Sequence, residues 1–247
     1  MLSPYGLDII ENCQICSMRA ERLFCDLSAE ALHAFEAIKS ATAYPKGAML
    51  FVEGQMPRGI FVLCQGTVKM SVYGKDGKKL IVKITEAGEV LGLSATLSGQ
   101  PYELSAETVE PCQVNFVNRH DFCRFLKEHP DACFKVAELL SEKYRIVCQE
   151  VRSLGLSRTV DRRLAKLLLE WVAKNGNAGE AEHRLELALT QEEIGQLIGT
   201  TRETVIRILA DLKRRQILEG KGTMLVIRDM SRLREIAGSL SLDLTYR

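Results

Sequence analysis

The hydrophobic and polar positions along the chain fall into three zones with different rhythms. From about Ala43 to Phe116, apolar residues alternate with polar ones in short runs separated by glycines, which is typical of β-strands joined by tight turns. The clearest two runs flank GKDGKK (residues 74–79), in which the Asp-Gly dipeptide favours a hairpin turn. Many short strands at this spacing predict a small antiparallel barrel or sandwich.

A long helical pattern follows the strands. It begins at Pro130 and continues to about Leu154, and Gly155 then interrupts it. Its apolar stripe is compatible with a helix packed on its own barrel and with a seam that pairs two subunits, and the narrow stripe and charged flanks favour the seam. The predicted dimerisation residues are Val136, Leu140, Tyr144, Val147, Val151 and Leu154.

A second domain begins after this helix. Residues 157–175 show the pattern of a new amphipathic helix, and RLELAL (184–189) that of a short strand. The chain is therefore expected to be an α+β protein with four parts. These are a cysteine-containing extension (1–29), a β-rich domain (30–129), a long helix (130–156) and a C-terminal domain (157–247).

The C-terminal domain contains the signature of two short helices joined by a tight turn. TQEE, from Thr190 to Glu193, is a capping box, and the helix that it opens ends at Gly199. Thr200 or Thr201 can cap the next helix, which is amphipathic and basic. Two β runs around GKG (220–222) follow as a wing. This order predicts a winged helix-turn-helix that binds double-stranded DNA.

The second of these helices carries side chains that suit DNA. Arginine can donate two hydrogen bonds to guanine, glutamate can accept one from cytosine, and threonine can meet a phosphate or a thymine methyl group. Basic residues at the far end of the helix suit phosphates. A solvated helix face with incidental ion pairs is the alternative. The predicted DNA-binding residues are Thr201, Arg202, Glu203, Thr204, Arg207, Lys213, Arg214 and Lys221.

Charge and composition exclude several classes of protein. Lysine and arginine number 33 against 32 acidic residues, with a slight basic excess after Ser157. No apolar run approaches the roughly 18 residues of a membrane span, and the N-terminus lacks a secretory pattern, so a cytoplasmic protein without a membrane partner is expected. Catalytic carboxylate pairs, Ser-His arrangements and Walker loops are not visible, which argues against an enzyme. A redox protein that uses its cysteines is the rival interpretation.

The chain has eight cysteines, and in a cytoplasmic protein these are expected to be thiols or metal ligands rather than disulfides. The C-x2-C pair of Cys13 and Cys16 lets two thiolates hold one metal centre, which two further thiolates complete. The cysteines that lie within strand or helix patterns are expected to be small buried residues. They are Cys64, Cys123, Cys133 and Cys148.

The glycine-punctuated β runs, the long helix and TQEEIGQLIGTTRETVIRIL (190–209) together resemble the cyclic-AMP receptor/FNR family of bacterial transcription regulators. The resemblance covers nearly the whole chain. It implies a cyclic-nucleotide-binding-like β-roll, a dimerisation helix and a homodimer that binds a palindromic operator with G·C-containing half-sites and acts with RNA polymerase, as an activator or a repressor. It also places Arg202, Glu203 and Arg207 at the family's base-reading positions.

The signal that such a regulator would sense differs between members of the family. In cyclic-nucleotide-binding relatives a glutamate binds the ribose and an arginine binds the phosphate. Leu93 and Leu104 stand at these two places. A buried phosphate without its countercharge is costly, which argues against cyclic AMP. Another small molecule could use the two leucines as an apolar pocket floor.

The cysteines offer a second signal. FNR-type oxygen sensors hold a 4Fe–4S cluster with an N-terminal cysteine trio and one cysteine of the late β-roll. By resemblance these would be Cys13, Cys16, Cys25 and Cys112, although eight residues separate the second and third cysteines, more than in the best-known member. Zinc, a thiol redox switch and no role at all are the alternatives.

Overall fold

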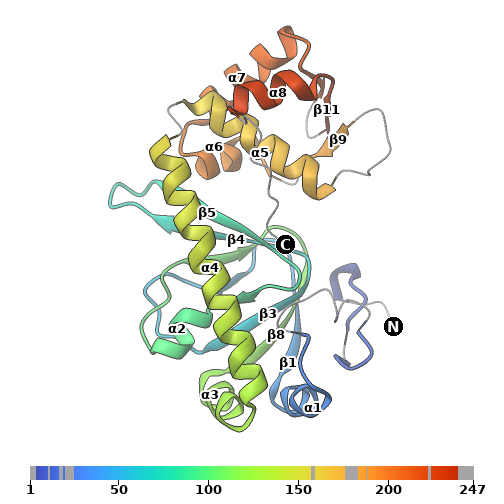
Figure 1. Ribbon diagram of the computed structural model, residues 1–247, viewed down its shortest axis with the longest axis vertical. Coiled ribbons are helices and arrows are strands. Elements are labelled where there is room, and N and C mark those ends of the chain that lie inside the picture. The colour runs from blue at the N-terminus through green and yellow to red at the C-terminus, as the bar shows by residue number, and fades with distance from the viewer. Residues whose placement is uncertain are drawn as a thin grey trace. The chain divides into compact units, whose positions relative to one another are not determined.

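The computed structural model of the chain contains two compact units, residues 1–149 and 150–247 (Figure 1). The structure describes residues 4–10, 12–16, 19, 25–156, 159–175, 183–187, 189–221 and 224–238. Within these ranges no helix is both long enough and apolar enough to cross a membrane.

The N-terminal unit is built around a β-roll, which agrees with the small antiparallel barrel or sandwich expected from the alternating pattern and with the roll that the family resemblance implies. Two four-stranded antiparallel sheets form it, in the orders β1-β8-β3-β6 and β2-β7-β4-β5. The strands are β1 (Ser40–Tyr44), β2 (Met49–Phe51), β3 (Gly59–Gln65), β4 (Thr67–Tyr73), β5 (Lys79–Glu86), β6 (Val90–Leu91), β7 (Ser105–Thr108) and β8 (Cys112–Asn118).

The hairpin predicted at GKDGKK joins β4 to β5. The backbone N–H of Gly74 donates to the carbonyl of Lys78 at 2.8 Å, which closes the turn. Gly77 has a φ of 77°, a conformation that costs other residues steric strain. The prediction is confirmed.

The strands of the β1-β8-β3-β6 sheet divide their side chains between two cores. On β3, Phe61 and Leu63 face the interior of the roll, whereas Ile60 and Val62 belong to an outer core. This division follows from the two-residue period of a β-strand. Aliphatic and aromatic side chains fill the interior, and the ring of Tyr102 stacks on that of Phe51 with 4.1 Å between centroids.

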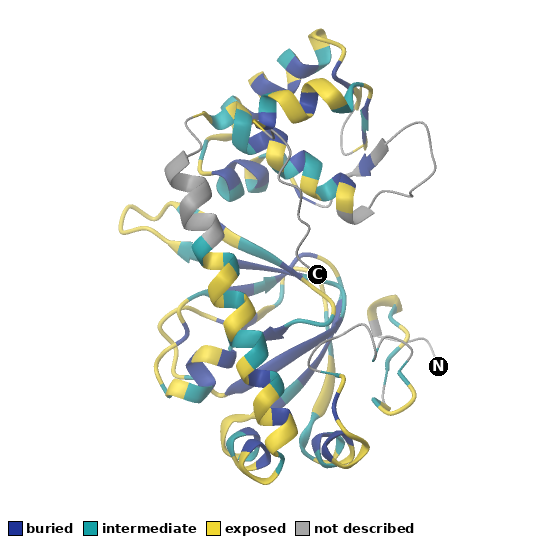
Figure 2. Cartoon of the chain, in the orientation of Figure 1, coloured by how far each residue is buried: buried dark blue, intermediate teal, exposed yellow. Residues whose placement is uncertain are grey.

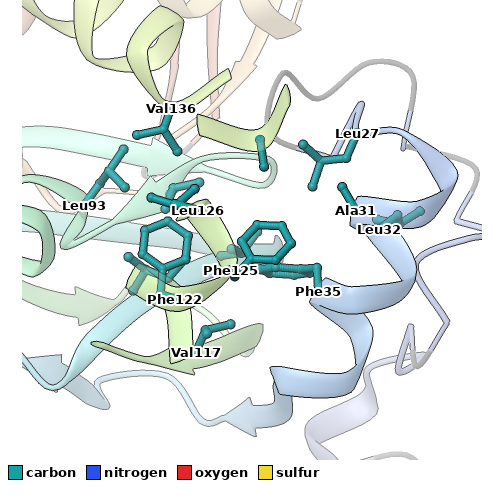
Figure 3. Close-up of a cluster of buried hydrophobic side chains, with 14 residues drawn as sticks. Leu27, Ala31, Leu32, Phe35, Leu93, Val117, Phe122, Phe125, Leu126 and Val136 are labelled. Atoms are coloured by element: carbon teal, nitrogen blue, oxygen red, sulfur yellow. The ribbon is translucent and has the colours of Figure 1, made fainter. Parts of the chain in front are cut away.

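Helices that the sequence pattern did not reveal cover the outer core. Phe35 of α1 and Phe122 and Phe125 of α3 converge on Val117 of β8 (Figure 3). The rings of Phe35 and Phe125 meet edge to face at 5.8 Å, a favourable geometry for aromatic pairs. These elements are α1 (Ala29–Ile38), α2 (Leu93–Ser98) and α3 (Arg119–Glu128), and a short helix, η1 (Pro4–Gly6), lies in the extension.

The long helix α4 (Pro130–Leu156) begins on the β-roll and continues through Gly155, where the pattern had predicted a break. Val136 is only 4% exposed and lies in the outer core, and Leu140 packs against that core. The assignment of Val136 to a dimer seam is therefore wrong, because its own roll covers it. Tyr144 and Val147 are 73% and 53% exposed, whereas the side chains of Val151 and Leu154 lie outside the described residues. Figure 2 shows that both buried and exposed residues lie along the described part of α4.

The C-terminal unit is a winged helix-turn-helix, as predicted. A three-stranded sheet in the order β10-β11-β9 accompanies four helices in the described part of this unit. The elements are α5 (Val160–Asn175), β9 (His183–Glu186), α6 (Gln191–Ile198), α7 (Arg202–Arg214), β10 (Leu218–Lys221), β11 (Met224–Ile227) and α8 (Met230–Ala237).

We expect Thr190→Ala to destabilise the C-terminal unit by about 1 kcal/mol, because α6 loses the hydroxyl that caps its Glu193 N–H. Trp171, the single tryptophan, lies on α5 of the same unit, so urea unfolding followed by its fluorescence measures this change. Glu192→Ala, at an exposed position in the same turn but outside the capping box, is the matched control and should cost less. Equal losses for both variants would contradict the capping argument.

Candidate functional site

The turn between α6 and α7 is fixed by hydrogen bonds and by two glycines. Thr190 and Glu193 form a reciprocal capping box, with N–H···O distances of 3.2 and 2.9 Å. Gly199 ends α6 in the left-handed conformation, at φ 67°. A Cβ atom on Gly195 would lie 3.0 Å from the carbonyl oxygen of Thr200, so a side chain there would push the two helices apart. The turn thus sets the direction in which α7 leaves α6.

Helix α7 separates a buried face from an exposed one. Thr201 caps it by accepting from the N–H of Thr204 at 3.3 Å. The buried face is made of Val205, Ile208, Leu209 and Leu212. The exposed face contains Arg202, Glu203, Ile206, Arg207, Ala210 and Arg214. The structure therefore places the predicted base-reading side chains together on a solvent-facing edge.

The carboxyl group of Glu203 lies on this edge, and its surroundings favour the ionised form, which accepts hydrogen bonds. Its own backbone N–H, the Thr201 hydroxyl and the Arg202 guanidinium lower the pKa of its carboxyl from the ordinary value. A carboxylate at a helix N-terminus is also stabilised by the helix dipole. At neutral pH, the edge thus presents a hydrogen-bond acceptor between arginine donors.

Two of the basic residues at the C-terminal end of α7 have partners within their own unit, which the sequence did not indicate. Lys213 donates to the carbonyl of Gly220 in the wing at 2.7 Å, so its ammonium joins the helix to β10. Arg214 forms an ion pair with Asp211. The side chain of Lys221 lies outside the described residues. Among these three predicted phosphate contacts, Arg214 is the one whose side chain is shown exposed.

Ile206 is a candidate DNA contact that the sequence interpretation missed. It is 41% exposed and lies one helical turn after Arg202 and Glu203, beside Arg207. Its neighbours on the exposed edge are charged, so an apolar side chain there is unusual. The signal was present in the sequence, because Ile206 does not fit the spacing of the buried stripe.

The N-terminal unit contains a cavity of about 20 Å³ where four cysteines meet. Such a volume holds about one water molecule. The thiols belong to Cys13, Cys16 and Cys25 of the extension and to Cys64 of β3, and all eight cysteines of the chain are thiols rather than disulfides. Leu27, Leu32, Phe35 and Val62 are among the apolar residues that complete the lining.

Polar side chains hold the extension over this cavity. The side-chain amide of Gln113 accepts from the N–H of Ile10 and donates to its carbonyl, both at 2.7 Å. The amide of Gln65 donates to the carbonyl of Asp8 at 2.7 Å. Glu36 of α1 accepts from the N–H of Cys13 at 2.6 Å. The extension is therefore held by both the sheet and α1.

Two polar groups face the Cys13 thiol. Its sulfur lies 3.1 Å from the ammonium of Lys39 and 3.8 Å from the amide nitrogen of Asn115. The other side-chain atom of Asn115, Oδ1, is buried and finds no hydrogen-bond partner within the described part of the chain. An unsatisfied buried carbonyl oxygen is costly, which marks the cavity as a place where a ligand or water would be accommodated.

Cys112 does not belong to this cavity. It is fully buried among the interior residues of the roll, and its thiol donates to the carbonyls of Thr67 and Glu110 at 3.4 and 3.2 Å. Burial raises the pKa of this thiol to about 11, with a further contribution from the Glu110 carboxylate. A Cβ on Gly66 would lie 2.6 Å from its sulfur, so Gly66 makes room for it.

Of the four predicted 4Fe–4S ligands, the structure brings Cys13, Cys16 and Cys25 together at this cavity, whereas Cys112 lies in the core of the roll. Over the described ranges, no three His, Cys, Asp or Glu side chains are already arranged to hold a metal ion. The expectation that four other cysteines are buried also needs correction. Cys133 is exposed, and Cys123 and Cys148 are half-buried, so Cys64 alone of those four is a buried residue.

The two leucines at the nucleotide-binding positions lie in different cores. Leu93 opens α2 and is buried in the outer core, whereas Leu104 packs against the interior of the roll. They consequently do not form the floor of one pocket, and that expectation is wrong. Both side chains are apolar, so neither can supply a countercharge to a phosphate.

Comparisons with known proteins match both units. A cyclic nucleotide-binding domain matches residues 41–129, and a Crp-like helix-turn-helix domain matches residues 162–236. Together these two matches cover the β-roll and the DNA-binding unit. The chain belongs to the Crp/Fnr family of transcription regulators.

Individual relatives agree with this family. The chain is 27% identical over 190 residues to the CRP-like cAMP-activated global transcriptional regulator of Mycobacterium tuberculosis, covering 77% of this chain and 84% of that protein. It is 24% identical over 185 residues to the cAMP-activated global transcriptional regulator CRP of Salmonella typhimurium, with 74% and 87% covered. The structure of FixK2 from Bradyrhizobium japonicum superimposes with a TM-score of 0.70 at 25% identity, over 83% of this chain and all of that one.

We expect Cys112 to resist alkylation in the folded protein at pH 8. With a pKa of about 11, about one thiol in a thousand is a thiolate there, and the sulfur is also shielded. Iodoacetamide labelling followed by peptide mass spectrometry measures this, with the exposed Cys133 as the internal control. Both should react in denaturant. Native labelling of Cys112 at the rate of Cys133 would contradict the assignment.

Proposed function

We propose that this transcription regulator binds a palindromic operator with G·C-containing half-sites as a homodimer. The observation that carries the proposal is the exposed leading edge of α7, where Arg202, Glu203 and Arg207 lie together. Arginine can form two hydrogen bonds to guanine, and the ionised Glu203 can accept one from cytosine. A helix that enters the major groove by its N-terminal residues would use all three.

The remaining predicted DNA contacts are assigned to the backbone. Thr201 and Thr204 lie at the start of α7, where hydroxyl and N–H groups suit a phosphate. Arg214 is exposed and can exchange its partner Asp211 for a phosphate. Lys213 contributes mainly by holding the wing through Gly220. Lys221 remains a proposed wing contact.

Pairing of two chains is proposed to use the exposed part of α4. Tyr144 and Val147 are large, apolar and largely uncovered, and large exposed apolar groups on one helix face favour a partner helix. Val151 and Leu154 would continue that stripe, and Leu140 would lie at its edge. A dimer would present two α7 helices to half-sites about one turn of DNA apart.

The signal is proposed to act at the cysteine cavity and to change DNA affinity. Four thiols, the Lys39 ammonium and an unsatisfied Asn115 oxygen offer chemistry for a soft ligand there. Because Leu93 and Leu104 stand where cyclic-nucleotide-binding relatives have a glutamate and an arginine, a signal other than the cyclic AMP named for two relatives is proposed. The signal biases a two-state equilibrium of the dimer, and recruitment of RNA polymerase as an activator is the proposed outcome.

We expect Arg207→Ala to weaken operator binding by about 1–3 kcal/mol and to relax the preference at one base pair, because a bidentate contact to guanine is lost. The operator is first selected from random duplex DNA, and fluorescence anisotropy then measures affinity for every single-base variant. Arg214→Ala is the matched control. It should weaken binding to all sequences alike and reduce the salt slope by about one.

Two outcomes would contradict this proposal. Uniform weakening by Arg207→Ala would assign Arg207 to a phosphate. A protein that stays monomeric and selects no duplex sequence, with or without its signal, would remove the operator-binding homodimer altogether.

We expect Ile206 to contact the methyl group of a thymine in the operator. Replacing that thymine by deoxyuridine removes one methyl group and should weaken wild-type binding about fourfold, since a buried methyl contributes about 0.8 kcal/mol. Ile206→Ala should show a similar loss on the thymine operator and little further loss on the uracil one. Additive losses, or no effect of deoxyuridine at any position, would contradict the contact.

A further inference from the structure

The sulfur of Cys13 has a cation and an amide beside it. The Lys39 ammonium donates to this sulfur at 3.1 Å, and the amide nitrogen of Asn115 lies 3.8 Å from it. The thiol of Cys64, which lines the same cavity, instead donates to the carbonyl of Val62 at 3.7 Å. A neighbouring cation can stabilise the thiolate, which is the nucleophilic form of a cysteine. The surroundings of Cys13 therefore suit a reactive thiol.

Three separate elements fix the groups of this site. The backbone N–H of Cys13 donates to the Glu36 carboxylate of α1 at 2.6 Å, which anchors the extension at this point. Lys39 is the C-cap residue of the same helix and interacts electrostatically with Glu36. Asn115 lies in the middle of β8, where it pairs with Ala41 of β1 and Val62 of β3. The thiol, the ammonium and the amide thus meet in a defined arrangement.

The cavity beside Cys13 limits the size of what can react there. Its volume of about 20 Å³ suits one water molecule, so one further oxygen atom on the sulfur has room. A bulky oxidant such as a peptide disulfide does not fit a space of this size. Phe35 and Val62 contribute to a lining that is largely apolar, which favours a small uncharged reactant over an ion.

The side-chain oxygen of Asn115 selects among small oxidants. Asn115 is 1% exposed and lines the cavity, and this oxygen has no hydrogen-bond partner within the described ranges. An unsatisfied buried acceptor favours a ligand that brings a hydrogen-bond donor. Dioxygen and nitric oxide carry no hydrogen, whereas a hydroperoxide has an O–H group. The chemistry of the cavity therefore matches a small hydroperoxide.

We propose that Cys13 is a modification site whose thiol a small hydroperoxide, such as hydrogen peroxide, oxidises to a sulfenic acid, with Lys39 as the proton donor and Asn115 as the acceptor that holds the product. The proposal deepens the proposed function and rests on it in one respect: the sulfenic acid is the signal that acts at the cysteine cavity. The oxidation itself does not depend on DNA.

The step is a two-electron transfer from sulfur to the peroxide. The Cys13 thiol first loses its proton to solvent, and the thiolate then attacks one peroxide oxygen. A sulfur–oxygen bond forms as the oxygen–oxygen bond breaks, so sulfur is oxidised and the peroxide is reduced. The Lys39 ammonium gives a proton to the leaving hydroxide, which departs as water, and the lysine amine regains a proton from solvent. The S–O–H group that remains donates to the Asn115 oxygen.

The test follows peroxide oxidation of the reduced full chain, with a metal chelator and with dimedone, a reagent that traps sulfenic acids, present throughout. Quenching at intervals and peptide mass spectrometry give the rate at each cysteine. We expect Cys13 to acquire dimedone at least about tenfold faster than Cys133, which is more exposed but is the internal control. Cys13→Ser should remove the fast adduct.

Variants of the two neighbours separate their roles. Lys39→Met keeps the length of the side chain but removes the proton donor, and it should slow the oxidation of Cys13 at least about tenfold. Lys46→Met removes an exposed lysine and is the matched control, with no expected change. Asn115→Leu removes the acceptor and should shorten the lifetime of the sulfenic acid about fivefold, the contribution of one hydrogen bond. Adding dimedone after increasing delays measures that lifetime, and circular dichroism checks folding.

Four results would overturn the proposal. These are oxidation of Cys13 no faster than that of Cys133, equal rates for Lys39→Met and Lys46→Met, a Cys13 disulfide without any dimedone adduct, and an unchanged lifetime in Asn115→Leu. Nitric oxide and dioxygen are run in parallel, and faster modification of Cys13 by either would contradict the choice of a hydroperoxide.

Operator affinity is measured separately on the same preparations. Peroxide should change it at least about fivefold in the wild type and leave it unchanged in Cys13→Ser. A protein that selects an operator but does not oxidise Cys13 retains the proposed DNA function and loses this site. One that oxidises Cys13 rapidly but selects no duplex DNA retains the site and loses the DNA function, and oxidation without a change in operator affinity would show that the sulfenic acid is not the signal.

Discussion

The two central strands of the β1-β8-β3-β6 sheet, β3 and β8, are buried on both faces, and this constraint determines what the N-terminal unit can do. One face lines the interior of the roll and the other carries α1, α3, the start of α4 and the extension. No side chain of β3 or β8 can change face without a register shift that would bury polar groups or expose apolar ones. The division of Cys64 and Cys112 between the two faces follows directly from it.

The same burial explains why the extension docks where it does. Gln113 and Asn115 are buried polar residues that alternate with apolar residues along β8. Buried amides are costly without partners, and the backbone of Ile10 satisfies both polar atoms of Gln113. The side-chain oxygen of Asn115 has no hydrogen-bond partner in the described chain, and Asn115 is one of the residues that line the thiol cavity.

In the C-terminal unit the decisive feature is the separation of the two faces of α7. The buried stripe holds the helix on the domain, and the capped, glycine-containing turn sets its direction, so the exposed edge does not depend on the side chains that read DNA. Substitutions at Arg207 or Ile206 can therefore change specificity at little cost in stability. Each unit has its own core, which permits a signal site in one and a DNA surface in the other.

The sequence by itself determined the antiparallel β-domain, the β4–β5 hairpin, the long helix, the capping box and the wing, because each rests on local periodicity or turn chemistry. It also predicted that Arg202, Glu203 and Arg207 lie together at the start of α7, since their helical spacing brings them close to one another. Only the tertiary structure decided that Val136 packs on its own roll, that Lys213 holds the wing, and that Cys64 rather than Cys112 meets the N-terminal thiols. These depend on which face of a strand or helix is covered by distant segments, and no local pattern carries that information.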